Sequence, residues 1–418
     1  MANIAGALTR LRREPLADFP LGKQLELLCD QCQYAWRDRL LTPLVTLRLF
    51  LLQILHGNTS ITHLRQLSGV GFSPGSYCEA RGRLPLEILQ RLLTALAAMG
   101  RNLRPVLVGP RVWVIDASNF SMGDFEGLGK QFGYPPHVKK GIGYPGAKIL
   151  GLMDLATGLF VKMVTLPLLA ADLSGILQVH PLLQAGDIVV GDRLYCAFVH
   201  LALLQARGAF ACARLMQNRE KKTGIQQWHR PAKKEASPWM KLKQFMGLPK
   251  TLTVRVVRYV VSQKGFRSRE IFIATTLLDE QAWPEEKLAE LYGQRWQIET
   301  CFNHLKTTMK MNVLKGQSLD IVLKELAVYL LVYNLVRLAI LKAAKTQGVD
   351  IWRISFVDAC RWLACRILGL MGVAELIVNP KRPGRFEPRV VRRRPKQYRL
   401  MTKPRKDPKA LILEQHAR

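Results

Sequence analysis

The sequence predicts an α/β protein in which a mixed sheet follows a helical N-terminal domain and precedes further helices and a basic tail. Three changes in pattern indicate this order. Apolar residues recur at helical spacing up to about residue 105. From residue 111 the pattern becomes short β-branched or apolar runs separated by Gly and Thr. After residue 381 basic residues and prolines dominate, and such a segment cannot form a core of its own.

Helical spacing in the N-terminal region is clearest in LTPLVTLRLFLLQIL and LEILQRLLTALAAMG. Between them, SITHLRQLSGVGFSPGSYCEARGRL predicts a helix, a Gly-containing turn and a second helix that carries Arg81 and Arg83 near its end. This pattern suits a DNA-binding helix-turn-helix, and it equally suits an ordinary helical hairpin.

The sheet begins with three strand-like runs, RVWVIDAS, AKILGLMDL and GLFVKMVTLP. The last two flank Ala156-Thr157-Gly158 and predict a hairpin. A helix (DLSGILQVHPLL), a strand (DIVVGD), a helix (AFVHLALLQARG) and a strand (AFACARL) are expected next. Three strands followed by alternating helices and strands is the order of a ribonuclease-H-like mixed sheet.

A polar, basic stretch then interrupts the alternation, and two strand-like runs follow it, TLTVRVVRYVVS and SREIFIATTLL. We interpret this part as a β-rich insertion. A long helix, EEKLAELYGQRWQIETCFNHLKTTMK, resumes the core, and two more helices reach about residue 373. The predicted segments are a helical N-terminal domain (1–105), the first part of the core (106–217), the β-rich insertion (218–281), the second part of the core with the C-terminal helices (282–375) and the basic tail (376–418).

Charge is the outlying property of the composition. The chain has 62 Lys and Arg against 31 Asp and Glu, which gives a net charge of +31 and a pI near 10.2. A folded chain this basic indicates a polyanionic partner, and nucleic acid is the first candidate because its phosphates bind Lys and Arg without regard to sequence. The tail alone has 13 Lys and Arg between residues 381 and 409.

An anionic membrane is the second candidate for that charge. The most apolar stretch, LAVYLLVYNLVRLAIL, contains Arg337 and is too short to span a bilayer comfortably. The N-terminus lacks an apolar run of signal-peptide length. We therefore expect a buried helix, no membrane association and a cytoplasmic, nucleoid-associated protein.

The eight cysteines are scattered, which suggests a reducing compartment. Cys29 and Cys32 form one CxxC pair, but no second pair or nearby His completes a zinc set. Both thiols lie in an apolar helical pattern, so burial is expected there rather than a metal site.

Two acids follow predicted strands. Asp116 comes directly after VWVI and Asp192 after DIVVG. Both are expected at the carboxyl edge of a sheet, where ligands commonly bind. Either acid alone could equally be a turn residue or a helix cap. Asp154 has that simpler role, because DLATG is a hairpin turn signal.

A third acid, Glu299, lies in the predicted long helix. At 100° per residue, Tyr292, Arg295, Glu299 and Lys306 share an arc of roughly 60° on one helix face. Such a face could be a solvated set of helical ion pairs. However, Lys306 is two turns beyond Glu299, and a line of cations beside one acid suits a DNA backbone that runs past a metal site.

Three carboxylates from separate elements suit one kind of chemistry. Cutting DNA with water and joining a 3′ hydroxyl to a new phosphate are both in-line phosphoryl displacements, which two divalent ions can promote. Hard ions such as Mg²⁺ prefer carboxylate oxygens and water to thiols or imidazoles. Asp116, Asp192 and Glu299 are therefore the candidate catalytic metal ligands, for Mg²⁺ or for Mn²⁺ in its place.

The spacing Tyr292-x2-Arg295-x3-Glu299-x6-Lys306 resembles the Y-R-E-K signature of bacterial insertion-sequence transposases of family four. VIDAS and GDRLY resemble that family's first and second catalytic blocks. SPGSYCEARGRLP resembles its N-terminal region and RPGRFEPRVVRRRP its basic tail. The similarity covers nearly the whole chain.

The resemblance implies a D-D-E transposase with a ribonuclease-H-like core, cut-and-paste chemistry and often a hairpin at the element end. It makes Asp116, Asp192 and Glu299 metal ligands. Tyr292, Arg295 and Lys306 become contacts to double-stranded DNA at the terminal inverted repeats. Target DNA and a second copy of the chain, in a synaptic homodimer, are the other implied partners. Base-flipping Trp residues of related insertions have weak counterparts in Trp228 and Trp239.

Two alternatives use the same features. An inactive, DNA-binding copy would act as a repressor, with binding that depends steeply on salt but no cleavage. A structure-directed nuclease on the same fold would cut DNA without joining it, because a fold does not fix the substrate.

Overall fold

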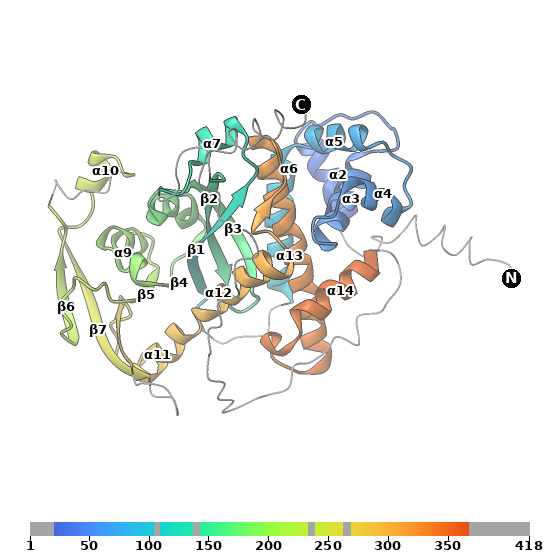
Figure 1. Ribbon diagram of the computed structural model, residues 1–418. Coiled ribbons are helices and arrows are strands. Elements are labelled where there is room, and N and C mark those ends of the chain that lie inside the picture. The colour runs from blue at the N-terminus through green and yellow to red at the C-terminus, as the bar shows by residue number, and fades with distance from the viewer. Residues whose placement is uncertain (1–20, 104–108, 137–142, 233–238, 262–268, 368–418) are drawn as a thin grey trace, which may run out of the picture.

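The structure, a computed structural model, describes residues 21–103, 109–136, 143–232, 239–261 and 269–367 (Figure 1). In this part of the chain one nine-stranded sheet has the order β3-β2-β1-β4-β5-β8-β7-β6, with β9 paired to β1. Strands β1, β4 and β5 run parallel, whereas β2, β3, β8, β7 and β6 pair antiparallel. The predicted mixed α/β class with a central mixed sheet is confirmed. The strands are β1 Val112–Met122, β2 Gly146–Asp154, β3 Leu159–Pro167, β4 Ile188–Gly191, β5 Phe210–Arg214, β6 Gly224–His229, β7 Thr251–Val261, β8 Arg269–Thr275 and β9 Val313–Leu314.

The hairpin predicted at residues 154–158 joins β2 to β3. Asp154 has the turn role expected of it, because its side chain accepts a hydrogen bond from the Ala156 N–H at 2.9 Å. Gly158 has a φ of +68°, a conformation that L side chains rarely adopt. This turn places β3 beside β2 along nearly the full length of both strands.

The prediction of one continuous helix over DLSGILQVHPLL is wrong. The chain there forms a 3₁₀ turn (Asp172–Gly175), one α-turn (α8, Ile176–Val179) and a second 3₁₀ turn that contains Pro181. Proline lacks the N–H that a continuing helix needs. The next predicted helix is present as α9, Phe198–Gln205, which packs on one face of the sheet.

The predicted insertion contains three strands and a short helix, α10 (Leu242–Met246). These strands continue the central sheet, since β8 pairs with β5 at Cys212↔Thr275. Figure 1 shows them at the end of the sheet far from α13. The segment 262–268 between the last two strands lies outside the described residues, as does the basic tail.

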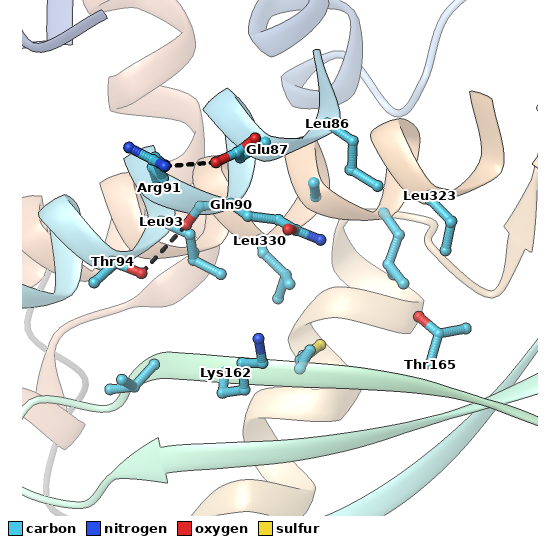
Figure 2. Close-up of a pocket in the computed structure, with 14 residues that line it drawn as sticks. Leu86, Glu87, Gln90, Arg91, Leu93, Thr94, Lys162, Thr165, Leu323 and Leu330 are labelled. Atoms are coloured by element: carbon cyan, nitrogen blue, oxygen red, sulfur yellow. Dashed lines mark hydrogen bonds and ion pairs between the residues drawn. The ribbon is translucent and has the colours of Figure 1, made fainter. Parts of the chain in front are cut away.

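The N-terminal region is helical in its described part, from residue 21 onward. The helices are α2 Leu21–Gln31, α3 Pro43–Leu55, α4 Ile61–Ser68, α5 Pro74–Arg83 and α6 Leu86–Asn102. Their apolar side chains share one core with Val114 of β1 and Val332 of α13. Figure 2 shows α6 facing β3 and α13 across a crevice. The crevice has a volume of ≈ 210 Å³, and its lining includes Glu87 and Arg91, which form an ion pair at 2.6 Å.

Helix α13 (Leu319–Gln347) contains the apolar stretch whose burial the sequence predicts. It is long and apolar enough to cross a membrane by composition, but 94% of its most apolar window is buried inside the protein. The buried-helix prediction is therefore confirmed, and Arg337 is buried within it. Helix α14 (Phe356–Ile367) packs beside α13. Together with α6 and α12 (Trp296–Asn303), α13 covers the face of the sheet opposite α9 (Figure 1).

Candidate functional site

Asp116 lies inside β1 rather than at its end. The prediction that β1 ends at this residue is wrong, because antiparallel pairing with β2 carries the strand on to Met122. The parallel pairing with β4 runs from Val112↔Ile188 to Val114↔Val190. Continuing that register by two residues sets Asp116 level with Asp192 on the neighbouring strand, where strands lie about 4.8 Å apart.

Asp192 follows β4 directly, at the carboxyl end expected from the sequence. Its Oδ1 accepts a hydrogen bond from the Leu194 N–H at 2.8 Å and so caps the 3₁₀ turn Arg193–Cys196. The preceding Gly191 has no room for a side chain, because a Cβ there would lie 2.6 Å from the Cβ of Tyr195. The GDRLY block thus has a packing reason for its glycine, and the cap leaves the second carboxylate oxygen of Asp192 available.

Glu299 lies on α12 (Trp296–Asn303) and is linked to Asp116 through Arg295. Arg295 Nη2 is 2.7 Å from Glu299 Oε1, and its Nη1 is 3.8 Å from Asp116 Oδ2. The Arg295 side chain is only 15% exposed. The guanidinium therefore bridges a strand residue and a helix residue that are far apart in the sequence.

The single long helix predicted around Glu299 is wrong. Helix α11 (Glu285–Gly293) ends at a glycine, the residue that disfavours helix most after proline, and α12 starts again after Arg295. A π-helical turn, His304–Thr308, follows α12. Short π segments often occur at functional sites.

The break alters how the four signature residues meet. The Arg295 guanidinium lies 5.8 Å from the centre of the Tyr292 ring, so these two residues stay together across the break. Burial raises the pKa of the Tyr292 hydroxyl above its ordinary value, so this group is neutral near pH 7. Lys306 reaches β1 from the π turn, where its Nζ donates to Ser118 Oγ at 3.3 Å. Ser118 is two residues beyond Asp116 and on the same strand face.

Electrostatics also connect the three acids. Burial, together with the charges of Asp192 and Glu299, raises the pKa of Asp116 to about 6. A hydrogen bond from the Ala117 N–H and the Arg295 guanidinium oppose that shift. A positive charge beside Asp116 would relieve the repulsion among the carboxylates.

The donor chemistry of this cluster fits Mg²⁺, because all three candidate ligands are carboxylates. As they stand, however, no three His, Cys, Asp or Glu side chains in the described ranges are spaced to share one metal ion. Arg295 supplies the positive charge between Asp116 and Glu299 instead. A metal ion held by both acids would have to displace this guanidinium from one of them.

Comparisons with known proteins identify the family. The transposase DDE domain family matches residues 108–335, more than half of the chain and a span that contains all six candidate residues. The chain belongs to the DDE transposase family. It is thus an enzyme, a transposase that acts on DNA. The chain is also 25% identical over 355 residues to the transposase InsG for insertion sequence element IS4 of Escherichia coli, over 78% of each chain. The predicted resemblance to family-four transposases is confirmed.

A solved structure was also found. The transposase aligns with a piggyBac transposase synaptic complex with hairpin DNA at a TM-score of 0.43 and 9% identity, over 77% of this chain and 70% of that one.

The tryptophans of the transposase differ in their exposure. Trp228, a weak base-flipping candidate, is 4% exposed and donates its indole N–H to Gln226 Oε1 at 3.0 Å. Trp239 packs against the same core. Trp296 is instead 55% exposed and immediately follows Arg295. Aromatic faces bind bases by stacking, and this indole, which stands inside the signature, is not among the residues that the sequence predicts for the site.

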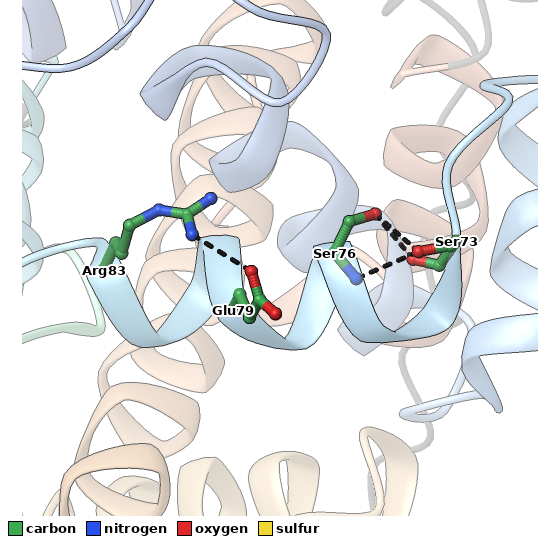
Figure 3. A network of polar contacts seen from close by, with 4 residues as sticks. All are labelled: Ser73, Ser76, Glu79 and Arg83. Carbon is green, nitrogen blue, oxygen red and sulfur yellow. Dashed lines mark hydrogen bonds and ion pairs between the residues drawn. The ribbon is translucent and has the colours of Figure 1, made fainter.

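The helix-turn-helix candidate consists of α4 and α5. Ser60 and Ser73 cap the two helices, and Gly69 ends α4 in the left-handed conformation. Figure 3 shows Ser73, Ser76, Glu79 and Arg83 along α5, with Arg83 3.4 Å from Glu79 and both side chains more than half exposed. Contact of this segment with DNA stays a prediction.

The CxxC pair has the buried character expected for Cys29. Cys29 is 1% exposed and its thiol is free, and Cys32 is partly buried. Burial raises the pKa of the Cys29 thiol to about 11, which disfavours the thiolate that zinc binds.

Proposed function

We propose that this transposase moves an insertion sequence by cut-and-paste transposition, through metal-dependent strand cleavage and transfer of the 3′ end. One observation carries the proposal: Arg295 links Asp116 on β1 to Glu299 on α12, at a point level with Asp192. The three acids thus come from three elements, and Arg295 lies between two of them. Mg²⁺, or Mn²⁺ in its place, is the proposed cofactor.

Each residue has a proposed role. Asp116, Asp192 and Glu299 hold two divalent ions, which when bound activate the attacking oxygen and stabilise the leaving oxygen. Tyr292, Arg295 and Lys306 contact phosphates of the transposon end. Arg295 and Lys306 carry charge, and Tyr292 offers a neutral hydroxyl as donor.

Arg295 has a second task in this proposal. Its guanidinium is well suited to bidentate binding of a phosphate. When an end phosphate binds, it competes with Glu299 for the same N–H groups. Transfer of Arg295 from carboxylate to phosphate would free Glu299 for metal, so DNA binding would prepare the acids.

The remaining assignments are also proposals. Residues 1–105 bind the element end, 106–217 and 282–375 form the catalytic core, 218–281 are the β-rich insertion and 376–418 are a basic tail. The core is proposed to be ribonuclease-H-like. Two copies act together on paired terminal inverted repeats and on target DNA, in the bacterial cytoplasm at the nucleoid. The charge of +31 supports a nucleic-acid partner.

The test uses DNA ends taken from short inverted repeats that flank the gene. The purified protein, labelled end DNA and unlabelled target DNA are incubated with Mg²⁺ or with EDTA. We expect cleavage at the element boundary and a joined product with target, both only with the metal. Binding without cleavage in Mg²⁺ or Mn²⁺ would identify a repressing copy. Cleavage without any joining would identify a nuclease.

A further inference from the structure

A groove of ≈ 480 Å³ opens beside Lys306, between the turn after α3 and the segment after the π turn. None of its eight lining residues is acidic, and three are lysines. The lining residues are Gly57, Asn58, Lys306, Thr307, Lys310, Asn312, Val313 and Lys315.

The three lysines carry charge without acidic partners. Within the described ranges no carboxylate lies within ion-pair distance of Lys306, Lys310 or Lys315. By contrast, Lys148 and Lys324 are paired with acids at 2.8 and 2.6 Å. Three like charges around one groove repel each other, and an anion bound there would remove that repulsion.

A buried carboxylate on α13 fixes both walls of the groove. Glu325 is 3% exposed, and its oxygens accept hydrogen bonds from Asn58 Nδ2 at 2.5 Å and from the Lys315 and Gly316 N–H groups at 3.0 and 2.8 Å. Lys315 Nζ donates to the Asn58 carbonyl and closes the junction. These neutral donors oppose the effect of burial, which still raises the pKa of Glu325, and they hold the walls in place before any ligand arrives.

Gly57 gives Lys310 its position. Its φ is +67°, and a Cβ there would lie 3.1 Å from Lys310 Cδ and 3.2 Å from Lys310 Nζ. The missing side chain lets the Lys310 ammonium lie over the turn from the N-terminal region. Lys310 itself has a positive φ of 64°, unusual for a residue other than glycine.

The groove continues the active site. Lys306 lines it and also contacts Ser118, which is two residues, or about 7 Å, along β1 from Asp116. Pairing of Val313 and Leu314 with Ser121 and Met122 fixes the groove segment to the same strand. The distance of about 7 Å between Asp116 and Ser118 along β1 equals the rise of about two nucleotides in one DNA strand.

We propose that this groove binds the phosphates of the DNA strand that runs on from the point of cleavage, with Lys310 and Lys315 as the contacts. The inference rests on the proposed transposase mechanism and extends it to DNA outside the element end. The shared chemistry is a phosphodiester backbone. It comes either from the donor DNA that flanks the element or from the target.

The test compares Lys310→Ala and Lys310→Ala/Lys315→Ala with the parent enzyme. The matched control is Lys345→Ala, an exposed lysine in the last turn of α13, roughly 30 Å along that helix from Glu325. Binding is measured across a range of salt on three DNAs: an end with its flank, a pre-cleaved end, and a pre-cleaved end with target. Melting temperatures check that each variant is folded.

We expect the dependence of log K on log salt to fall by about 0.9 per lysine on the flanked end or on the target-containing complex. The DNA that responds identifies the source of the strand. Ethylation of the phosphates that Lys310 contacts should weaken DNA binding by the parent enzyme but leave binding by Lys310→Ala unchanged. The proposal would be overturned if the salt slopes of the groove variants equalled those of Lys345→Ala on all three DNAs. It would also be overturned if the slope changed on the bare pre-cleaved end. Parent cleavage in Mg²⁺, scored in parallel, reports separately on the proposed function.

Discussion

Replacing Asp116 with Asn is expected to slow Mg²⁺-dependent cleavage of element-end DNA by at least about 10³-fold while binding of that DNA is retained. Asn keeps the size of the side chain and an oxygen that can accept the Ala117 N–H, but it lacks the charge that a metal ion requires. Glu299→Gln should behave alike, because it removes the second charge beside Arg295. Single-turnover cleavage and filter binding measure the two properties separately.

Glu290→Gln is the matched control for these variants. Glu290 is an exposed acid on α11, outside the cluster around Arg295. Its loss should change the cleavage rate by no more than about twofold, as is usual for surface substitutions. Equal cleavage by the parent and by Asp116→Asn would contradict the assignment of the acids.

Arg295→Ala is expected to have opposite effects on metal and on DNA. Without DNA, Mn²⁺ affinity should rise about tenfold or more, because the cation that competes for Glu299 and Asp116 is gone. With end DNA, cleavage should fall, because a phosphate contact is lost as well. In the parent enzyme, addition of end DNA should itself increase Mn²⁺ affinity. Titration followed by electron paramagnetic resonance of free Mn²⁺ measures the two affinities, and single-turnover cleavage measures the rate.

Arg295→Lys serves as the control for charge alone. It keeps a cation near the acids but not the bidentate geometry, so Mn²⁺ affinity should stay close to that of the parent. If Arg295→Ala and the parent bind Mn²⁺ equally with and without DNA, Arg295 does not compete with metal.

Local patterns in the sequence were enough to predict much of the fold. Alternating and β-branched runs marked the central strands, and the turn signal at Asp154 marked the β2–β3 hairpin. The apolar run of α13 indicated burial because Arg337 made a membrane span unfavourable. Each of these features depends on residues close together in the chain.

Features set by distant contacts escaped prediction. Pairing with β2 extends β1 past Asp116, and nothing in VWVIDAS indicates where that partner ends. The insertion joins the central sheet because β8 pairs with β5, and these two strands are about 60 residues apart in the sequence. The break before Arg295 was signalled by Gly293, but helical periodicity through the whole segment concealed it.

The candidate site was predictable as a set of residues but not as an arrangement. The spacing of Tyr292, Arg295, Glu299 and Lys306 identified the set. Placing them on one continuous helix face was wrong, because Lys306 reaches Ser118 from a π turn. Spacing also gave no sign that Arg295 would lie between two acids.

The most direct test of the central claim is iron-directed cleavage of the protein chain in the presence of end DNA. Fe²⁺ bound in place of Mg²⁺, with ascorbate and hydrogen peroxide, generates hydroxyl radicals that cut the backbone near the metal. Three acids that share the metal predict fragments ending near Asp116, Asp192 and Glu299, all suppressed by excess Mg²⁺ and lost in Asp116→Asn. Cuts confined to other regions, such as Cys29 and Cys32, or an unchanged pattern in Asp116→Asn, would contradict the account.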